Sequence, residues 1–229
     1  MKKPINKLFG LADNLTGLHL DQFAREIKYY INVIIKKDAG YNRDYYRSME
    51  INCRDSYNIL AKAIVNEFHP STAVDVGCGY GGMSKAMINA GCNEVYSYDY
   101  SSDAVAICLE TGLKHAYQLN LIHANQIPVK GDVCICLEVA EHIPERHAHN
   151  MCKLISEVAP ILIFTASPPG QGGYLHVNLK KQDYWINIFK RYSMIYDHDS
   201  VNNMRKSIQD KINNEYYRNL MVFKRNAPA

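Results

Sequence analysis

The sequence predicts an α/β fold with a doubly wound, mostly parallel seven-stranded sheet and an N-terminal helical cap. Three observations support this prediction. From residue 72 onward, short apolar runs alternate with helical patterns. Before residue 70, the pattern of apolar residues is helical. A glycine-rich segment directly follows the first apolar run, at the kind of position where such sheets bind ligands.

The N-terminal part is expected to be a helical unit outside the sheet. Apolar side chains recur at helical spacing between Leu20 and Ile35, and Gly40 is the expected end of that helix. A second helical pattern covers residues 45–68 and ends before Pro70. We therefore assign residues 1–70 to a helical cap and residues 71–229 to the core domain.

The core is expected to alternate strands and helices. The strands are predicted at residues 72–76, 94–98, 116–119, 132–137, 161–166, 194–197 and 216–224. The helices are predicted at residues 82–90, 102–111, 145–158, 180–192 and 203–213. Ligands of such sheets bind at the carboxyl ends of the strands, so functional residues are sought directly after each strand.

Bulk composition narrows the function classes. A length of 229 residues fits one α/β domain, and the net charge of +3 comes without a clustered basic segment, so no nucleic-acid partner is indicated. No run approaches the length of a membrane span. Seven cysteines without a CxxC pair, and no signal peptide, favour a reducing cytoplasm. No His, Cys or carboxylate spacing closes a coordination shell, so no metal site is expected.

The glycine-rich segment limits the choice of cofactor. Gly77, Gly79 and Gly82 fit a G-x-G-x-x-G pattern, which nicotinamide-dependent oxidoreductases also contain. Asp75 precedes the first of these glycines by two residues. A carboxylate there suits the ammonium group of a methionine moiety and is unfavourable beside a pyrophosphate. Asp99 ends the second predicted strand, where its oxygens suit the cis-diol of a ribose in either cofactor.

Residues 73–82, 98–99 and 138–144 together resemble the class I S-adenosylmethionine (SAM)-dependent methyltransferases of the small-molecule type. The resemblance covers about residues 70–225 and implies SAM as cofactor and S-adenosylhomocysteine (SAH) as product. It also implies cofactor contacts at Asp75, Gly77, Cys78, Gly79, Asp99, Tyr100, Asn120, Leu121 and Glu138. Many relatives carry Asp in place of Asn120, whose amide can still accept a hydrogen bond from adenine. For Cys78, packing within the loop is the expected role.

The acceptor side is sought in the Pro- and Gly-rich segment 167–178, which follows the fifth predicted strand. His176 and Asn178 alternate across Val177, so an extended chain would point both to one side. His176 is the first catalytic candidate, as a base or as an orienting group, with a structural loop histidine as the alternative. Glu138 is the second catalytic candidate. For His142, a role in the turn before the next helix is expected, with acceptor contact as the alternative.

The segment 41–47 is aromatic and basic. In relatives, helices before the first strand cover the active site, which implies that the cap acts as a lid. Tyr41, Arg43, Tyr45 and Tyr46 could therefore close over SAM or hold an anionic acceptor. The alternative is an ordinary loop-to-helix junction with half-buried tyrosines.

These features predict an O-methyltransferase that acts on a hydroxyl or carboxylate of a small molecule or short peptide, in bacterial tailoring metabolism. Oxygen is favoured because the fourth predicted strand is not followed by an Asn-Pro-Pro-Tyr-like tetrapeptide, which is typical of methylation of amino groups on bases and glutamine. The open alternatives are methylation of a peptide C-terminal carboxylate, N-methylation, a nicotinamide oxidoreductase and a SAM-binding protein without catalysis.

Overall fold

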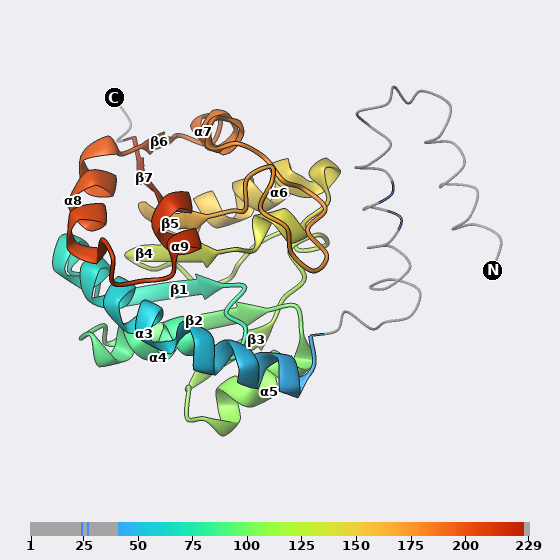
Figure 1. Ribbon diagram of the computed structural model, residues 1–229, viewed down its shortest axis with the longest axis vertical. Helices are drawn as coiled ribbons and strands as arrows, with labels where there is room; N and C mark the ends of the chain where they lie inside the picture. Colours follow the sequence, from blue (N-terminus) through green and yellow to red (C-terminus); the bar gives the residue numbers. More distant parts are fainter. Residues whose placement is uncertain (1–23, 25–26, 28–40, 227–229) are drawn as a thin grey trace.

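A seven-stranded sheet with the order β3-β2-β1-β4-β5-β7-β6 forms the centre of the molecule (Figure 1). The computed structural model describes residue 24, residue 27 and residues 41–226. The strands are β1 (Thr72–Val76), β2 (Glu94–Asp99), β3 (His115–Gln118), β4 (Val133–Leu137), β5 (Ile161–Thr165), β6 (Met194–Tyr196) and β7 (Met221–Arg225). Only β7 runs antiparallel to its neighbours, so the predicted mostly parallel sheet is confirmed.

The central strands are buried on both faces. Val133, Cys134, Ile135 and Cys136 are all fully buried along β4. In register, Val74 of β1 lies opposite residues of both β2 and β4. Continuous apolar runs of this kind are typical of parallel strands that are covered by helices on both sides.

Two helical layers cover the sheet. The helices are α3 (Arg43–Phe68), α4 (Gly82–Asn89), α5 (Ser102–Glu110), α6 (Glu145–Ser156), α7 (Gln182–Lys190), α8 (His198–Ile208) and α9 (Asn214–Asn219), with a short 3-10 turn at Ala140–His142. One face packs against α6 and α7, with Trp185 and Phe189 fully buried. The other face packs against α3, α4 and α8.

Helix α3 belongs to this second layer. Asn42 caps its start, because the side-chain oxygen accepts a hydrogen bond from Tyr45 N at 3.0 Å. Leu60, Ala61 and Ile64 are buried in one cluster with side chains of α4 and β1. The predicted division at residue 70 therefore does not coincide with a break in packing. Most of residues 1–40, including the predicted end of a helix at Gly40, lie outside the described residues.

The C-terminal segment differs from the prediction. Residues 216–219 were expected to begin the last strand, but they belong to α9, and β7 starts at Met221. The alternation of apolar and polar residues fits a strand and a helical turn equally well. Tyr216, Asn219 and Leu220 are buried at i, i+3 and i+4, which is helical spacing.

The cysteines and helices add two observations. All seven cysteines are buried, and none of them forms a disulfide bond. Among the described residues, no helix has both the length and the hydropathy that crossing a bilayer requires.

The topology defines where a ligand can bind. β1 and β4 are neighbours in the sheet, yet the chain leaves them toward opposite edges, so their carboxyl ends border a crevice. In Figure 1 the β1 arrow points toward the side where α3 begins and where the β5–α7 loop lies. These two segments therefore border the same end of the sheet.

Candidate active site

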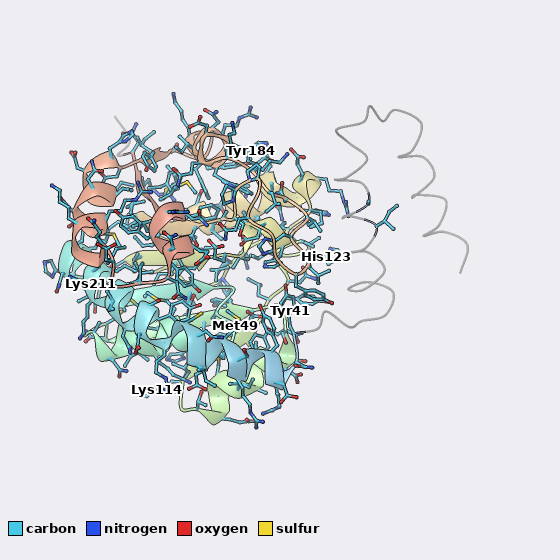
Figure 2. All side chains as sticks on the ribbon, in the orientation of Figure 1. Tyr41, Met49, Lys114, His123, Tyr184 and Lys211 are labelled. Atoms are coloured by element: carbon cyan, nitrogen blue, oxygen red, sulfur yellow. The ribbon has the colours of Figure 1, made fainter. Side chains whose placement is uncertain are left out.

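An open cleft lies at the carboxyl ends of β1, β2 and β4, with about 1110 Å³ of space when its mouth is included. Twelve residues predicted as site residues line it: Tyr41, Tyr45, Tyr46, Gly77, Cys78, Gly79, Asp99, Tyr100, Asn120, Leu121, Glu138 and His142. Figure 2 labels Tyr41 and Met49, which mark the α3 side of this cleft.

The glycine-rich loop is held close to the cleft by its backbone. Gly77 has a φ of +78°, and a β-carbon there would collide with the side chain of Val139. Gly77 N and Cys78 N both donate to the carbonyl of Tyr98, at 2.7 and 3.0 Å. Gly79 follows with a φ of +54°. Glycine at these two positions is thus required by conformation, and at the first also by space.

Asp99 joins the loop to the end of β2. Its Oδ2 accepts from Gly79 N at 2.8 Å, and its Oδ1 accepts from Ser101 N at 2.8 Å. Burial raises the pKa of Asp99, and these backbone hydrogen bonds oppose the rise. Each carboxylate oxygen keeps further acceptor capacity. The side chain can therefore shape the loop and still accept from a ribose diol.

Asp75 does not line the cleft. It is buried, and its Oδ2 accepts from Ser84 Oγ at 2.6 Å. Burial raises the pKa of Asp75 to about 7, the Ser84 hydrogen bond opposes this shift, and the nearby Asp99 adds to it. The expected direct contact with the methionine part of SAM is not supported by this position. The side chain joins β1 to α4 instead, one layer behind the cleft.

Tyrosines make up much of the wall. Tyr46 lies over Gly79, with its Cε1 at 3.6 Å from where a β-carbon would be. Tyr46 thus lies on the cofactor side rather than on the predicted acceptor side. Four further lining tyrosines were not predicted as site residues: Tyr57, Tyr80, Tyr98 and Tyr216. Tyr80 and Tyr98 belong to the motif segments, whereas the count of seventeen tyrosines was the only sequence signal for Tyr57 and Tyr216.

Arg43 lies outside the cleft. Its guanidinium forms an exposed, bidentate ion pair with Glu110, with both N–O distances at 2.8 Å. The prediction that Arg43 holds an anionic acceptor is therefore not supported. Tyr41 does reach the site, because its hydroxyl is 3.0 Å from His142 Nδ1. His123, labelled in Figure 2, is exposed and does not line the cleft.

Asn120 lines the adenine side expected from the resemblance. Its Oδ1 accepts from Ile122 N at 2.9 Å, so part of its hydrogen-bonding capacity fixes its own turn. The second lone pair of that oxygen and the amide NH₂ stay available. Tyr100, next to Asp99, lines the cleft with 46% of its surface exposed, which leaves its ring open to a flat partner.

Glu138 projects into the cleft from the end of β4 with an unusual backbone. Its φ is +52°, in the left-handed region that residues with a β-carbon seldom adopt. The carboxylate accepts hydrogen bonds from Ser167 Oγ, Gln171 Nε2 and Asn219 Nδ2, at 2.9, 3.1 and 3.1 Å. Of these three partners, only Ser167 and Gln171 lie in the loop that was predicted to carry function.

Glu141, His142 and His176 form a compact cluster beside Glu138. One potential ligand atom from each lies within 4.8 Å of the others. Glu141 is fully buried, and its Oε1 lies 2.9 Å from Ser167 Oγ, whose single hydrogen is shared with Glu138 Oε2. Its Oε2 has no hydrogen-bond partner among the described residues. Burial and the charge of Glu138 raise the pKa of Glu141 well above its usual value. Three side chains with metal-ligating atoms thus come together here, although spacing along the chain did not indicate a metal site.

The two histidines of the cluster are neutral at neutral pH. Burial lowers the pKa of His142 to about 3, and the neighbouring His176 lowers it further. Burial also lowers the pKa of His176. The ring of His176 packs 4.8 Å from that of His142, and its Nε2 is 4.0 Å from Glu141 Oε1. His176 therefore reaches the cleft through His142 and Glu141, and it does not line the wall itself.

Asn178 does not join this cluster as predicted. It is 1% exposed, and its backbone N donates to the carbonyl of Glu141 at 3.0 Å. Its side-chain amide has no hydrogen-bond partner among the residues that the structure describes. Its position is behind the 3-10 turn, so a direct contact with an acceptor is not supported.

Comparison with known proteins identifies the domain. Residues 74–162 match the model of a methyltransferase domain. A ubiquinone biosynthesis O-methyltransferase from Azoarcus sp. (strain BH72) is 30% identical over 125 residues, which cover 52% of this chain and 53% of that protein. The chain thus spans about half the length of that relative. A second ubiquinone biosynthesis O-methyltransferase, from Proteus mirabilis (strain HI4320), is 35% identical over 78 residues, which cover 31% of this chain and 31% of that protein.

Solved structures share the fold. Magnesium protoporphyrin IX methyltransferase from Synechocystis PCC 6803, with bound SAH, superposes with a TM-score of 0.56 at 18% identity, covering 91% of this chain and 96% of that one. A sugar N-methyltransferase from Streptoalloteichus sp ATCC 53650 gives 0.63 at 10% identity, covering 80% and 92%. Residues 74–162 thus match a methyltransferase domain, and the described residues share the fold of solved methyltransferases, one of them with SAH bound.

Proposed function

We propose that the protein transfers the methyl group of SAM to a hydroxyl oxygen of a small molecule or short peptide. The observation that carries this proposal is the cluster of Glu141, His142 and His176 beside Glu138 at the edge of the cofactor cleft. A hydroxyl acceptor must lose a proton as it is methylated, which requires a nearby base. A carboxylate acceptor is already an anion at neutral pH and needs none.

The charges around the cleft favour an uncharged acceptor. Among the described residues that line it, the acidic side chains are Asp99 and Glu138, and none is a lysine or arginine. An acceptor carboxylate would therefore meet like charges without a counter-charge from the described part of the chain. Methylation of a peptide C-terminal carboxylate is thus the less supported alternative. The relatives named as O-methyltransferases also favour oxygen over nitrogen.

Glu138 is the proposed contact with the acceptor proton. It lines the cleft, and its carboxylate is held by three neutral donors. His176 is the second proposed participant, because a neutral imidazole can accept a proton. It lies behind Glu141, so it would accept a proton from the other side chains of the cluster and would not contact the acceptor.

We also propose that Glu141, His142 and His176 can hold a divalent cation. The donor set fits: one carboxylate and two neutral imidazoles suit zinc, manganese or iron. Glu141 Oε2 is buried without a partner, which a cation would satisfy. A cation bound there would supply Lewis-acid stabilisation to an acceptor oxygen as it loses its proton. With a cation bound, His176 would be a ligand, so Glu138 would take up the proton.

Three further parts of the account stay proposals. Of the predicted lid over residues 1–70, the start of α3 keeps that proposed role, supported by its tyrosines that line the cleft, whereas the rest of α3 packs in the core. A cytoplasmic location is supported by the seven buried thiols without a disulfide. A role in bacterial tailoring metabolism is supported by the resemblance to small-molecule methyltransferases.

An acceptor panel tests the proposal. Phenol, benzoate and benzylamine skeletons with matched substituents would be incubated with methyl-labelled SAM, with EDTA and then with Zn²⁺, Mn²⁺ or Mg²⁺ restored. We expect methylated phenols only, with turnover lowered by EDTA and restored by one cation. Methyl esters or methylamines as the main products would refute the hydroxyl assignment. Turnover that is indifferent to EDTA and cations would refute the cation site alone. SAM binding without any turnover would favour a non-catalytic protein.

A further inference from the structure

We infer that Asn219 is a positioning residue for Glu138, and that it holds the Glu138 carboxylate in place at the wall of the cleft. The inference rests on the proposed function, in which Glu138 contacts the acceptor. Asn219 lies in α9, a helix that the sequence did not predict, and is 4% exposed. No pattern in the sequence connects it with the end of β4, which is 81 residues earlier.

The hydrogen bonds around the Glu138 carboxylate form one connected network. Glu138 Oε1 accepts from Asn219 Nδ2 at 3.1 Å. Glu138 Oε2 accepts from Gln171 Nε2 at 3.1 Å and from Ser167 Oγ at 2.9 Å. Asn219 Nδ2 also donates to Gln171 Oε1 at 3.0 Å, which fixes the orientation of the second amide. Each carboxylate oxygen thus has its own amide donor, and the two amides hold each other.

The backbone of Glu138 makes such support necessary. Its left-handed φ of +52° is strained for a residue with a β-carbon and persists only where the surroundings enforce it. The main chain is held by β5, because Glu138 N donates to Thr165 Oγ1 at 2.9 Å and to Thr165 O at 3.2 Å. Those bonds fix the backbone and leave the side-chain torsions free. The amides of Gln171 and Asn219 remove that freedom.

The donors around the Glu138 carboxylate are neutral. The carboxamides of Gln171 and Asn219 donate hydrogen bonds without adding charge and do not titrate. The arrangement therefore fixes the side chain without placing a cation beside it.

Variants at Asn219 test the inference, with the acceptor that gives the highest turnover in the phenol panel. We expect Asn219→Ala to lower kcat by about 10- to 100-fold, as loss of a supporting hydrogen bond does around ligating side chains, with SAM affinity within twofold. Asn219→Asp should lower kcat further, because a carboxylate oxygen would replace the Nδ2 donor beside the acceptor oxygens of Glu138 and Gln171. Asn214→Asp, on the exposed start of the same helix, makes the same change in charge and should match wild type. Should the alanine variant not fold, Asn219→Ser repeats the test with a smaller gap.

A crystal structure of Asn219→Ala with SAH bound gives a readout that does not depend on activity. The Glu138 carboxylate should leave its wild-type position or become disordered, while Asp99 and the glycine-rich loop stay in place. An unmoved carboxylate together with wild-type kcat would overturn the inference.

A donor–acceptor exchange separates positioning from stability. In Glu138→Gln/Asn219→Asp the hydrogen bond is restored in the opposite direction, so the thermal stability lost in Asn219→Asp should return while kcat stays low. Recovery of both stability and kcat would show a purely structural contact. The single variant Glu138→Gln shows which of the two proposals is wrong. If it is fully active, the proposed function of Glu138 fails. If it is inactive while Asn219→Ala is fully active, only the positioning role fails.

Discussion

Replacing Asp99 by alanine tests how the cofactor half of the cleft is built. The carboxylate accepts from Gly79 N and Ser101 N, both at 2.8 Å, and it is the proposed partner of the ribose hydroxyls. Asp99→Ala removes the acceptor from both backbone donors and from the cofactor at once. We therefore expect weaker SAM binding, with the fold preserved by the core behind β2.

The magnitude follows from the contacts that are lost. Hydrogen bonds to a charged group contribute about 1.5–3 kcal/mol each. Losing one such contact to the ribose corresponds to a SAM dissociation constant raised by about 10- to 150-fold, since about 1.4 kcal/mol is a factor of ten. The loosened Gly79 and Ser101 can only add to this loss. Asp99→Asn should fall between wild type and Asp99→Ala, because one side-chain oxygen remains.

Isothermal titration calorimetry with SAM and with SAH measures this effect, with thermal unfolding as the check on the fold. Asp103→Ala is the matched control, since Asp103 is exposed, lies four residues further on and carries the same charge. It should leave the SAM dissociation constant within about threefold of wild type, because surface charges contribute little. A folded Asp99→Ala that binds SAM as tightly as wild type would refute the reasoning about the ribose.

Three further predictions follow from the geometry. Gly77→Ala should abolish SAM binding by calorimetry, because its β-carbon would collide with Val139 at a φ of +78°; a folded variant with wild-type affinity would contradict the loop assignment. Asp75 has a raised folded-state pKa of about 7, so its contribution to stability is fully present below about pH 4 and is lost as the pH rises through 7. Asp75→Asn should flatten the fall in the free energy of unfolding over that range in denaturant titrations, and equal slopes would argue against the buried acid. Arg43→Ala should change neither SAM affinity nor kcat measurably, since the Arg43–Glu110 pair is exposed and outside the cleft; a raised KM for the acceptor would return Arg43 to the site.

The cofactor side could be predicted from sequence because its signals are local. The loop that contains Gly77 and Gly79 joins the end of β1 to the start of α4 through a turn that requires positive φ, all within a short stretch of sequence. Asp99 ends the next strand, and parallel strands bring such ends to one edge. Asp75 shows the limit of this reasoning. It belongs to the recognised motif, but side chains alternate between the two faces of β1. The Asp75 side chain lies on the face toward α4, where it accepts a hydrogen bond from Ser84, and not at the cleft.

The acceptor side could not be predicted because tertiary packing assembles it. Glu141 was part of a recognised segment, yet nothing in the sequence indicates that it is fully buried against Ser167 and His176. The cluster of Glu141, His142 and His176 was not predicted for the same reason, since spacing along the chain does not show that these side chains meet across two loops. Asn219 was missed because one helical turn and the start of a strand share the same pattern of apolar residues.

The central claim is that the cluster beside Glu138 directs the methyl group to a hydroxyl oxygen. It is tested most directly by a short peptide that ends in tyrosine, since one molecule then offers a phenolic hydroxyl, a carboxylate and an amine to the same site. Tandem mass spectrometry of the product locates the added methyl group, with Glu138→Gln as the comparison. The account predicts a methyl ether on the tyrosine that Glu138→Gln forms at least about 100-fold more slowly. A methyl ester or a methylamine as the main product, formed equally fast by Glu138→Gln, would contradict it.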